Sequence, residues 1–269
     1  MPALIEISDP VDPRIDMYRE IRERDLVGRK GLFVAEGKVV VEKLTDSAHH
    51  HPLSLLIASK RVEALQPIIA RLASDVPVYV AAQPVIDAIA GFSMHRGILA
   101  IGRRTTVMAA DDLLAACEDR AMVLVLSGIA NHDNLGGIFR NAAAFGADAV
   151  LLDGDCCDPL YRKAIRVSVG ATLLVPFARI VRQENMIDLL ERHAFSPVAL
   201  SPTGADLLSD WRPGPRTAVL LGAEGPGLSA KIIGRTRSVR IAMSGGFDSL
   251  NVATTSGIVL HHIASVPPK

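Results

Sequence analysis

Three short segments of this sequence combine glycines with side chains that can hold or donate a proton. They read SGIANHDNLGGIFRNAAAFGA from residue 127, LGAEGPGLS from residue 221 and MSGGFDSLNVATTSGIVLHH from residue 243. Loops of small residues leave backbone N–H and C=O groups open to a flat ligand, which is how an adenine edge can be recognised without charged side chains. The segments therefore predict a flat ligand held beside polar side chains.

The elements around these segments predict that the three come together. Each follows an apolar run that is typical of a buried strand, and the second half of the chain has six such runs, at residues 122–128, 148–152, 172–177, 197–201, 218–224 and 238–243. Continuous apolar strands indicate a parallel sheet covered by helices on both faces. Because ligands of open parallel sheets bind beyond the carboxyl ends of the strands, the three segments should meet there.

The first half shows the same alternation of strand and helix patterns. Apolar runs at 31–37, 53–59, 76–82 and 97–102 alternate with helical patterns around 14–26, 38–46, 60–73 and 83–90. A mixed stretch, RRTTVMAADDLLAACEDR, separates the two series and predicts a short helix around Asp111 to Cys117. The sequence thus predicts an α/β protein with a domain at 1–105, a linker at 106–120 and a second domain at 121–269.

Composition limits the classes of protein. The chain has 269 residues, 49% of them hydrophobic, and its 29 Lys and Arg balance its 29 Asp and Glu, so contact with a nucleic acid requires a local basic patch. No apolar run approaches a membrane span, and the first residues lack the layout of a signal peptide. Three cysteines, two of them adjacent, give no metal-ligand spacing and fit a reducing compartment. We expect a cytoplasmic protein without a metal.

Each segment also has a structural explanation of its own. The glycines at 222, 225 and 227 could permit turns, and Asn134 and Ser249 could each cap a helix. Caps and turns do not explain the glycines before Ser249, or Glu224 at the end of a buried strand. A dinucleotide fold is disfavoured because Gly136 and Gly137 are adjacent and lack the G-x-G-x-x-G spacing, which argues against an oxidoreductase.

The segments NHDNLGGIFRNAAAFGAD, LLGAEGPGLS and IAMSGGFDSLNVATTSG, in this order and spacing, resemble the three motifs of the SpoU (TrmH) family of RNA ribose 2′-O-methyltransferases, part of the SPOUT superfamily. The resemblance covers about residues 120–265. More loosely, YREIRERDLVGRKGLFVAEGKVVVEKL and SMHRGILAIGRR resemble the small α/β substrate-binding domain that often precedes the catalytic domain.

The resemblance implies that the carboxyl-terminal sheet is threaded into a trefoil knot, an exception to the rule against threading. The knotted crossing would fall at SGGFDSLNV, where Gly245 and Gly246 would remove side-chain bulk. S-adenosylmethionine is the implied cofactor, with contacts from Gly222, Ile241, Met243 and Leu250. Relatives usually carry proline where this chain has Ala242, a departure that affects local stiffness more than chemistry.

Methyl transfer to a ribose hydroxyl requires positioning of the oxygen and support for its negative charge, and it requires no metal. The resemblance places Arg140 at the motif-one arginine. A guanidinium keeps its proton, so Arg140 would stabilise the developing alkoxide or hold a phosphate. Glu224 could accept a proton, orient Arg140 or serve as a structural carboxylate. Asn134, Ser249 and Asn251 could orient ribose and cofactor, or act as caps and turn formers.

Local basic groups are the candidates for contact with RNA. Arg29 and Lys30 lie in a glycine-flanked loop, and Arg162, Lys163 and Arg166 form a second group that we expect near the first motif. The family resemblance implies an enzyme that methylates ribosomal or transfer RNA and that works as a homodimer, because knotted relatives pair through the helices at the cofactor site. The alternative is an RNA-binding module of the same fold without catalysis, which loss of Arg140 or of the SLN segment would have favoured; neither is lost.

Overall fold

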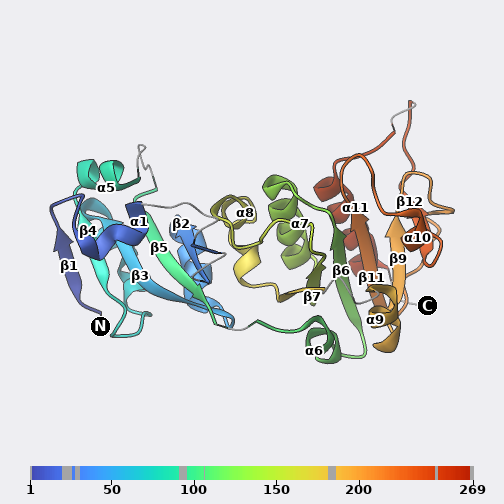
Figure 1. Ribbon diagram of the computed structural model, residues 1–269, viewed down its shortest axis with the longest axis horizontal. Helices are drawn as coiled ribbons and strands as arrows, with labels where there is room; N and C mark the ends of the chain where they lie inside the picture. The colour runs from blue at the N-terminus through green and yellow to red at the C-terminus, as the bar shows by residue number, and fades with distance from the viewer. Residues whose placement is uncertain are drawn as a thin grey trace. The chain divides into compact units, whose positions relative to one another are not determined.

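The computed structural model describes residues 2–19, 26–27, 31–90, 96–105, 107–180, 186–245 and 248–266. The chain forms two compact units (Figure 1). Unit 1 comprises Met1–Thr106 and Leu160–Leu174, and unit 2 comprises Val107–Pro159 and Val175–Lys269. The segment Leu160–Leu174 therefore belongs to unit 1, although the sequence places it inside the predicted domain at 121–269. No helix in the described part of the chain is long and apolar enough to span a membrane.

Unit 1 is built on a mixed sheet in the order β1-β4-β3-β5-β2. Its strands are β1 (Leu4–Ile7), β2 (Leu32–Glu36), β3 (His50–Ala58), β4 (Val78–Ala81) and β5 (Ile98–Arg104). Strands β1, β4 and β3 are parallel, whereas β5 is antiparallel to both β3 and β2. The described helical elements are η1 (Pro13–Ile15), α1 (Asp16–Arg19), α3 (Lys38–Asp46), η3 (Ser59–Arg61), α4 (Val62–Ile69), α5 (Gln83–Ala90), α8 (Arg162–Val167) and η4 (Ala171–Leu173).

Polar contacts join the late segment of the chain to helix α3 of unit 1. The Lys43 ammonium donates to the carbonyl of Val169 at 2.7 Å, and the Ser47 hydroxyl donates to that of Leu173 at 2.6 Å. Nearer the core, the buried hydroxyls of Tyr18 and Ser54 are 2.7 Å apart. These contacts explain why residues 160–174 form part of unit 1.

Unit 2 contains a seven-stranded sheet in the order β10-β12-β9-β11-β6-β7-β8, and all of its pairings are parallel. The strands are β6 (Ala121–Ser127), β7 (Ala149–Leu152), β8 (Phe177–Arg179), β9 (Ser196–Leu200), β10 (Asp206–Leu207), β11 (Arg216–Gly222) and β12 (Arg237–Arg240). Described helices are α6 (Ala110–Ala115), α7 (His132–Ala144), α9 (Met186–Arg192), α10 (Ala230–Ile233) and α11 (Val252–Ser265). The predicted α/β class with a parallel carboxyl-terminal sheet is confirmed.

One predicted strand is wrong. Residues 172–177 begin in the 3₁₀ helix η4, and the strand of this region, β8, starts only at Phe177. Gly170 precedes η4 in a left-handed conformation, φ 79°, and the buried Ser168 hydroxyl lies 3.4 Å from that of Thr172. An apolar run of this length can be buried in either kind of element, so its pattern does not distinguish them.

Helices α7 and α11 pack side by side in unit 2 (Figure 1). The backbones approach so closely that a Cβ on Gly137 would lie 2.7 Å from the Cβ of Ala253. Asn141 of α7 donates to the Ala253 carbonyl at 2.7 Å and to the Ser256 hydroxyl at 2.9 Å. This packing places helix α7 of the first glycine-rich segment against the amino-terminal end of helix α11 in the third segment. The trefoil knot stays a prediction of the family resemblance.

Candidate functional site

The three glycine-rich segments meet at one hydrogen-bonded cluster in unit 2. Asn134 of α7 donates to Glu224 Oε1 at 2.8 Å. The Asn251 amide donates to Asn134 Oδ1 at 2.8 Å and to the same Glu224 oxygen at 3.2 Å. We call Asn134, Glu224 and Asn251 the amide–carboxylate triangle. It joins three predicted catalytic residues that are far apart in sequence, and it leaves Glu224 Oε2 without a hydrogen bond from the described residues.

The helix caps at this site differ from the sequence-based alternatives. Asn131, and not Asn134, caps α7 by accepting from the Asp133 N–H at 2.7 Å. Asn251, and not Ser249, caps α11 by accepting from the N–H groups of Ala253 and Thr254 at 2.9 and 3.2 Å. Capping through Oδ1 fixes the Asn251 amide so that its nitrogen faces Asn134 and Glu224. Asn134 is buried, with 7% of its surface exposed, and its side chain is hydrogen-bonded to Glu224 and Asn251.

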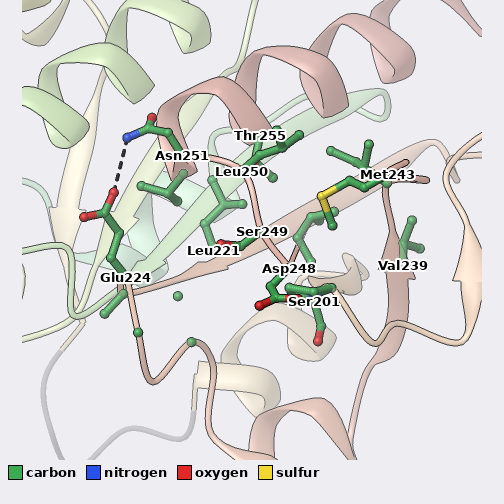
Figure 2. Close-up of a pocket in the computed structure, with 18 residues that line it drawn as sticks. Ser201, Leu221, Glu224, Val239, Met243, Asp248, Ser249, Leu250, Asn251 and Thr255 are labelled. Carbon is green, nitrogen blue, oxygen red and sulfur yellow. Dashed lines mark hydrogen bonds between the residues drawn. The ribbon is translucent and has the colours of Figure 1, made fainter. Parts of the chain in front are cut away.

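A cavity of about 510 Å³ adjoins the triangle. Glu224 and Asn251 lie together on one side of it and Met243 on another (Figure 2). All four predicted cofactor contacts line this cavity, namely Gly222, Ile241, Met243 and Leu250. Three of the predicted catalytic residues also line it, namely Glu224, Ser249 and Asn251. Its size falls in the range of roughly 300–1,000 Å³ typical of small-molecule sites.

Glycines shape the cavity wall in two different ways. A Cβ on Gly222 would lie 2.4 Å from the backbone of Gly227 and Leu228, so only glycine lets the loop fold back over the end of β11. Gly245 has φ 72°, yet a Cβ there would meet nothing within 4 Å. Backbone conformation therefore favours glycine at this position, and the expectation that Gly245 removes side-chain bulk beside the cofactor stays a prediction. Gly246 lies outside the described residues.

The chemistry of the wall suits a flat, positively charged ligand such as S-adenosylmethionine. Leu221, Ile241 and Leu250 offer apolar surface for a ring, and the backbone at Gly222 is accessible for hydrogen bonding. Glu224 and the exposed Asp248 are the charged side chains among the described lining residues, which include no Lys, Arg or His. The residues present therefore fit the cofactor. In the described part of the chain, no group of three His, Cys, Asp or Glu side chains has a metal-binding arrangement.

Asp153 anchors the loop that leads from β6 into the first motif. Its carboxylate accepts from the Ser127 hydroxyl at 2.7 Å and from the Gly128 N–H at 3.0 Å. Burial raises the pKa of Asp153, but hydrogen bonds from Ser127, Gly128 and neighbouring groups outweigh it, and the net shift is downward. Cys156 packs beneath the same loop, where burial raises the pKa of its thiol to about 12 and keeps it protonated.

Arg140 does not join the triangle. It lies six residues beyond Asn134 on α7, which is about 9 Å along the axis and about 120° around it. The Arg140 side chain is exposed, does not line the cavity, and has no hydrogen bond or ion pair with the described residues. Within one copy of the chain, this predicted catalytic residue is separated from the other four.

The predicted RNA-binding residues have different outcomes. Arg29 and Lys30 lie outside the described residues. Arg162 forms an ion pair with buried Glu36 at 2.9 Å in unit 1. Lys163 and Arg166 are exposed on the same helix, α8, which packs against β2. The short helix packs against the sheet of unit 1, although its sequence lies between strands of unit 2, and the expectation that this group lies near the first motif stays a prediction.

Several cavity residues were not anticipated from the sequence. The loop after β9 contributes Ser201 and Pro202, and Asp248 and Thr255 complete the wall near the third segment. The end of β9 carries no glycine motif, so only the position of β9 in the sheet could have indicated that residues there line the cavity. It is the carboxyl end of a strand that lies between β11 and β12, where ligands of parallel sheets gather.

The fold and site define an α/β protein with a small-molecule cavity at the carboxyl ends of a parallel sheet, and sequence comparison identifies its family. Residues 121–261 match the SpoU rRNA Methylase family. An uncharacterized tRNA/rRNA methyltransferase of Mycobacterium bovis is 38% identical over 265 residues, covering 95% of this chain and 90% of the relative. The chain belongs to the SpoU family of RNA methyltransferases.

Two further similarities extend the comparison. The 23S rRNA (guanosine-2′-O-)-methyltransferase RlmB of Salmonella typhi is 28% identical over 215 residues, which cover 77% of this chain and 87% of that protein. A crystal structure of an S-adenosylmethionine-bound rRNA methyltransferase from Sinorhizobium meliloti has a TM-score of 0.79 and 23% identity, covering 96% of this chain and 97% of the other. The latter similarity shows that the fold extends over both units.

Proposed function

We propose that this protein transfers a methyl group from S-adenosylmethionine to a ribose 2′-hydroxyl of ribosomal or transfer RNA. The observation that carries the proposal is the amide–carboxylate triangle at the edge of a cavity lined by Gly222 and Leu250. It brings all three family motifs to one place and gives that place a proton acceptor. The relatives named as tRNA/rRNA methyltransferases and as a guanosine-2′-O-methyltransferase support the same chemistry.

When bound, S-adenosylmethionine supplies an electrophilic methyl group on a sulfonium. The chain's own residues have to place the ribose oxygen in line and support its charge. Asn134 and Asn251 both donate to Glu224 Oε1, which fixes the carboxylate plane. Oε2 is then directed by this arrangement to accept from a ribose hydroxyl or to orient an incoming guanidinium. Ser249, in the cavity wall beside Leu250, can donate to the ribose or to the cofactor's carboxylate.

Arg140 gives a reason to propose a homodimer. The guanidinium lies on a face of α7 turned about 120° from the triangle, and it is exposed without a partner among the described residues. A second copy of the chain could pair with the first through the helices at the cofactor site. Its Arg140 would then reach the triangle of the first copy, which the first copy's own Arg140 does not reach. The arginine would then stabilise the developing alkoxide or hold the adjacent phosphate. We place the enzyme in the cytoplasm, where its RNA is.

Mass spectrometry of nucleosides tests the reaction. Purified protein is incubated with S-adenosylmethionine and unmodified transcripts of ribosomal and transfer RNA, and the RNA is digested to nucleosides. The proposal predicts 2′-O-methylated nucleosides in the presence of the wild-type protein and none with Glu224→Gln, which keeps the size of the side chain but removes the acceptor charge. Methyl groups found only on bases would refute ribose chemistry. Binding of RNA without any methylation would favour the alternative of an inactive binding module.

A further inference from the structure

The carboxyl ends of β2 and β3 and the beginning of β5 lie in a row at one edge of the unit 1 sheet. The Gly37 N–H, just beyond β2, donates to the Ile98 carbonyl at 3.1 Å. The Ala58 N–H, at the end of β3, donates to the Gly97 carbonyl at 3.0 Å. Gly37 and Gly97 have φ of 94° and 64°, conformations that favour glycine. Two residues without side chains therefore lie next to one another across this edge.

An arginine side chain lies over each of these glycines. A Cβ on Gly37 would be 3.0 Å from Arg96 Cδ and 3.2 Å from its Nη1. A Cβ on Gly97 would be 3.0 Å from Arg61 Cγ and 3.6 Å from its Nε. We call Arg61 and Arg96 the glycine-backed arginine pair. Both are exposed, and neither forms a hydrogen bond or ion pair with a described residue.

The neighbouring charges leave this edge positive. Exposed Lys38 and Lys60 flank the pair. The carboxylate of Glu36, beside Gly37, is buried and already neutralised by Arg162 at 2.9 Å. Glu42 is 3.8 Å from the Lys38 ammonium, and Glu63 is the acid nearest to Arg61 in the sequence. Because the whole chain has no net charge, a local surplus of this kind is what attracts a polyanion.

We propose that the glycine-backed arginine pair binds the phosphate backbone of the RNA substrate. The proposal rests on the proposed function and adds two named side chains in unit 1. Arg96 lies in the segment SMHRGILAIGRR, which resembles part of the family's substrate-binding domain, whereas Arg61 lies outside the quoted segments. A guanidinium presents a planar fork of N–H donors that matches phosphate oxygens. Packing of both side chains against glycine backbone restricts their rotamers before RNA arrives, which lowers the entropy cost of binding. Because neither arginine has an ion-pair partner among the described residues, binding of a phosphate breaks none of the described ion pairs.

Fluorescence anisotropy with the full-length protein and a labelled RNA hairpin tests the surface. The affinity is measured over a series of KCl concentrations for the wild type, Arg61→Ala/Arg96→Ala and Arg61→Lys/Arg96→Lys. The matched control is Arg235→Ala/Arg237→Ala, which removes two exposed arginines of unit 2 that are paired with Asp188 and Asp206. Calorimetry with S-adenosylmethionine on each variant checks the fold of unit 2 independently of RNA.

The alanine pair should weaken RNA binding about tenfold and make the slope of log affinity against log salt shallower by about 1.4 to 1.8, the contribution of two phosphate contacts. The lysine pair should keep most of the slope because the charges remain. Cofactor binding should not change. An alanine pair that binds RNA with the wild-type slope overturns the inference, as does an equal loss in the unit 2 control. Failure of the proposed function would look different: the wild type itself would bind RNA or cofactor without methylating ribose.

Discussion

The two sheets of this protein carry side chains of opposite charge at corresponding edges, where strands end at their carboxyl ends. At the carboxyl ends of β2 and β3 in unit 1, Arg61 and Arg96 lie against glycine backbone and face solvent. At the carboxyl ends of the unit 2 strands, the described cavity wall contains Glu224 and Asp248 but no basic side chain. The difference teaches that strand geometry fixes where a ligand binds, whereas the residues after each strand determine its charge. Under the two proposals, the cationic cofactor binds at the edge of the unit 2 sheet, and phosphates of the RNA bind at the edge of the unit 1 sheet.

The largest effect that can test this comparison concerns Arg140, an exposed cation of unit 2 that does not line the cavity. Under the proposed function, Arg140→Ala should lower the methylation rate by about a hundredfold or more, because a donor to the transition state is lost. Cofactor affinity should stay nearly unchanged, since Arg140 does not line the cavity. Arg140→Lys should recover little, because an ammonium lacks the planar fork. Single-turnover rates at saturating RNA and cofactor give the answer.

A different pattern would assign Arg140 to RNA binding alone. The rate at saturating RNA would then survive in Arg140→Ala, while RNA affinity would fall and its salt dependence would become shallower. That result would place a phosphate contact in unit 2 and weaken the separation of charges between the two edges.

The next effect concerns the amide–carboxylate triangle. Asn134→Asp replaces the amide that donates to Glu224 with a second carboxylate, so the two acids repel one another in a partly buried site. We expect unfolding free energy to fall by about 1–3 kcal/mol and methylation to fall at least tenfold. Asn131→Asp is the matched control, because aspartate caps a helix as well as asparagine does. Chemical denaturation and initial rates measure both variants, and equal behaviour of the two would show that the triangle has no special role.

Acid should destabilise the two units at different pH values, because the titratable groups inside them take up protons at different pH. Burial and the nearby charges of Arg104, His49 and His51 lower the pKa of His50 in unit 1 to about 4. Between about pH 6.5 and pH 4 the unfolded chain binds a proton at this position and the folded chain does not. Stability should therefore decrease by up to about 3 kcal/mol as the pH falls through this window. Thermal unfolding of wild type and His50→Leu across the window measures the difference, with the exposed His51→Leu as control.

The partly buried Asp153 of unit 2 should cause no change in stability over that range. The pKa of Asp153 is below its ordinary value, so its contribution is complete above about pH 4 and is lost only when the pH falls further. If His50→Leu loses stability on acidification as the wild type does, another group governs unit 1.

The smallest effect concerns the charge of the cavity wall. Asp248→Asn should weaken binding of S-adenosylmethionine about threefold at low salt, because an exposed carboxylate attracts the cationic cofactor only modestly. Binding of S-adenosylhomocysteine, which lacks the sulfonium charge, should change less. Calorimetry at two salt concentrations distinguishes these outcomes, and Asp119→Asn, an exposed acid that does not line the cavity, is the control. An equal change for both ligands would exclude a charge effect.

Local pattern was sufficient to predict much of the fold. The helical patterns at 38–46 and 83–90 have the bounds of α3 and α5, and the strand runs that precede the three motifs agree with β6, β11 and β12 to within a few residues. Short edge strands were missed. β1 has four residues and β10 has two, and both are held by backbone pairing with distant strands instead of by a strong pattern of their own.

Contacts over long sequence separations limited what could be predicted of the site. The motifs indicated Asn134, Glu224 and Asn251, but their mutual hydrogen bonds depend on how α7 and α11 pack at Gly137. Sequence alone left cap and catalytic roles open for Asn251, and the structure shows that its side chain caps α11 through Oδ1 while its amide nitrogen donates to Glu224. The sequence did not bring Arg61 and Arg96 together, because their arrangement depends on the pairing of β3, β5 and β2.

Calorimetric titration with S-adenosylmethionine, without added metal, tests most directly the central claim that the cavity beside the triangle is the cofactor site. The wild type should bind the cofactor, and Leu250→Arg should abolish binding because a long side chain would fill the cavity and a second positive charge would oppose the sulfonium. Ile258→Arg, at an equally exposed apolar position of α11 outside the wall, should bind normally. Normal binding by Leu250→Arg would contradict the account, because the cofactor would then bind elsewhere.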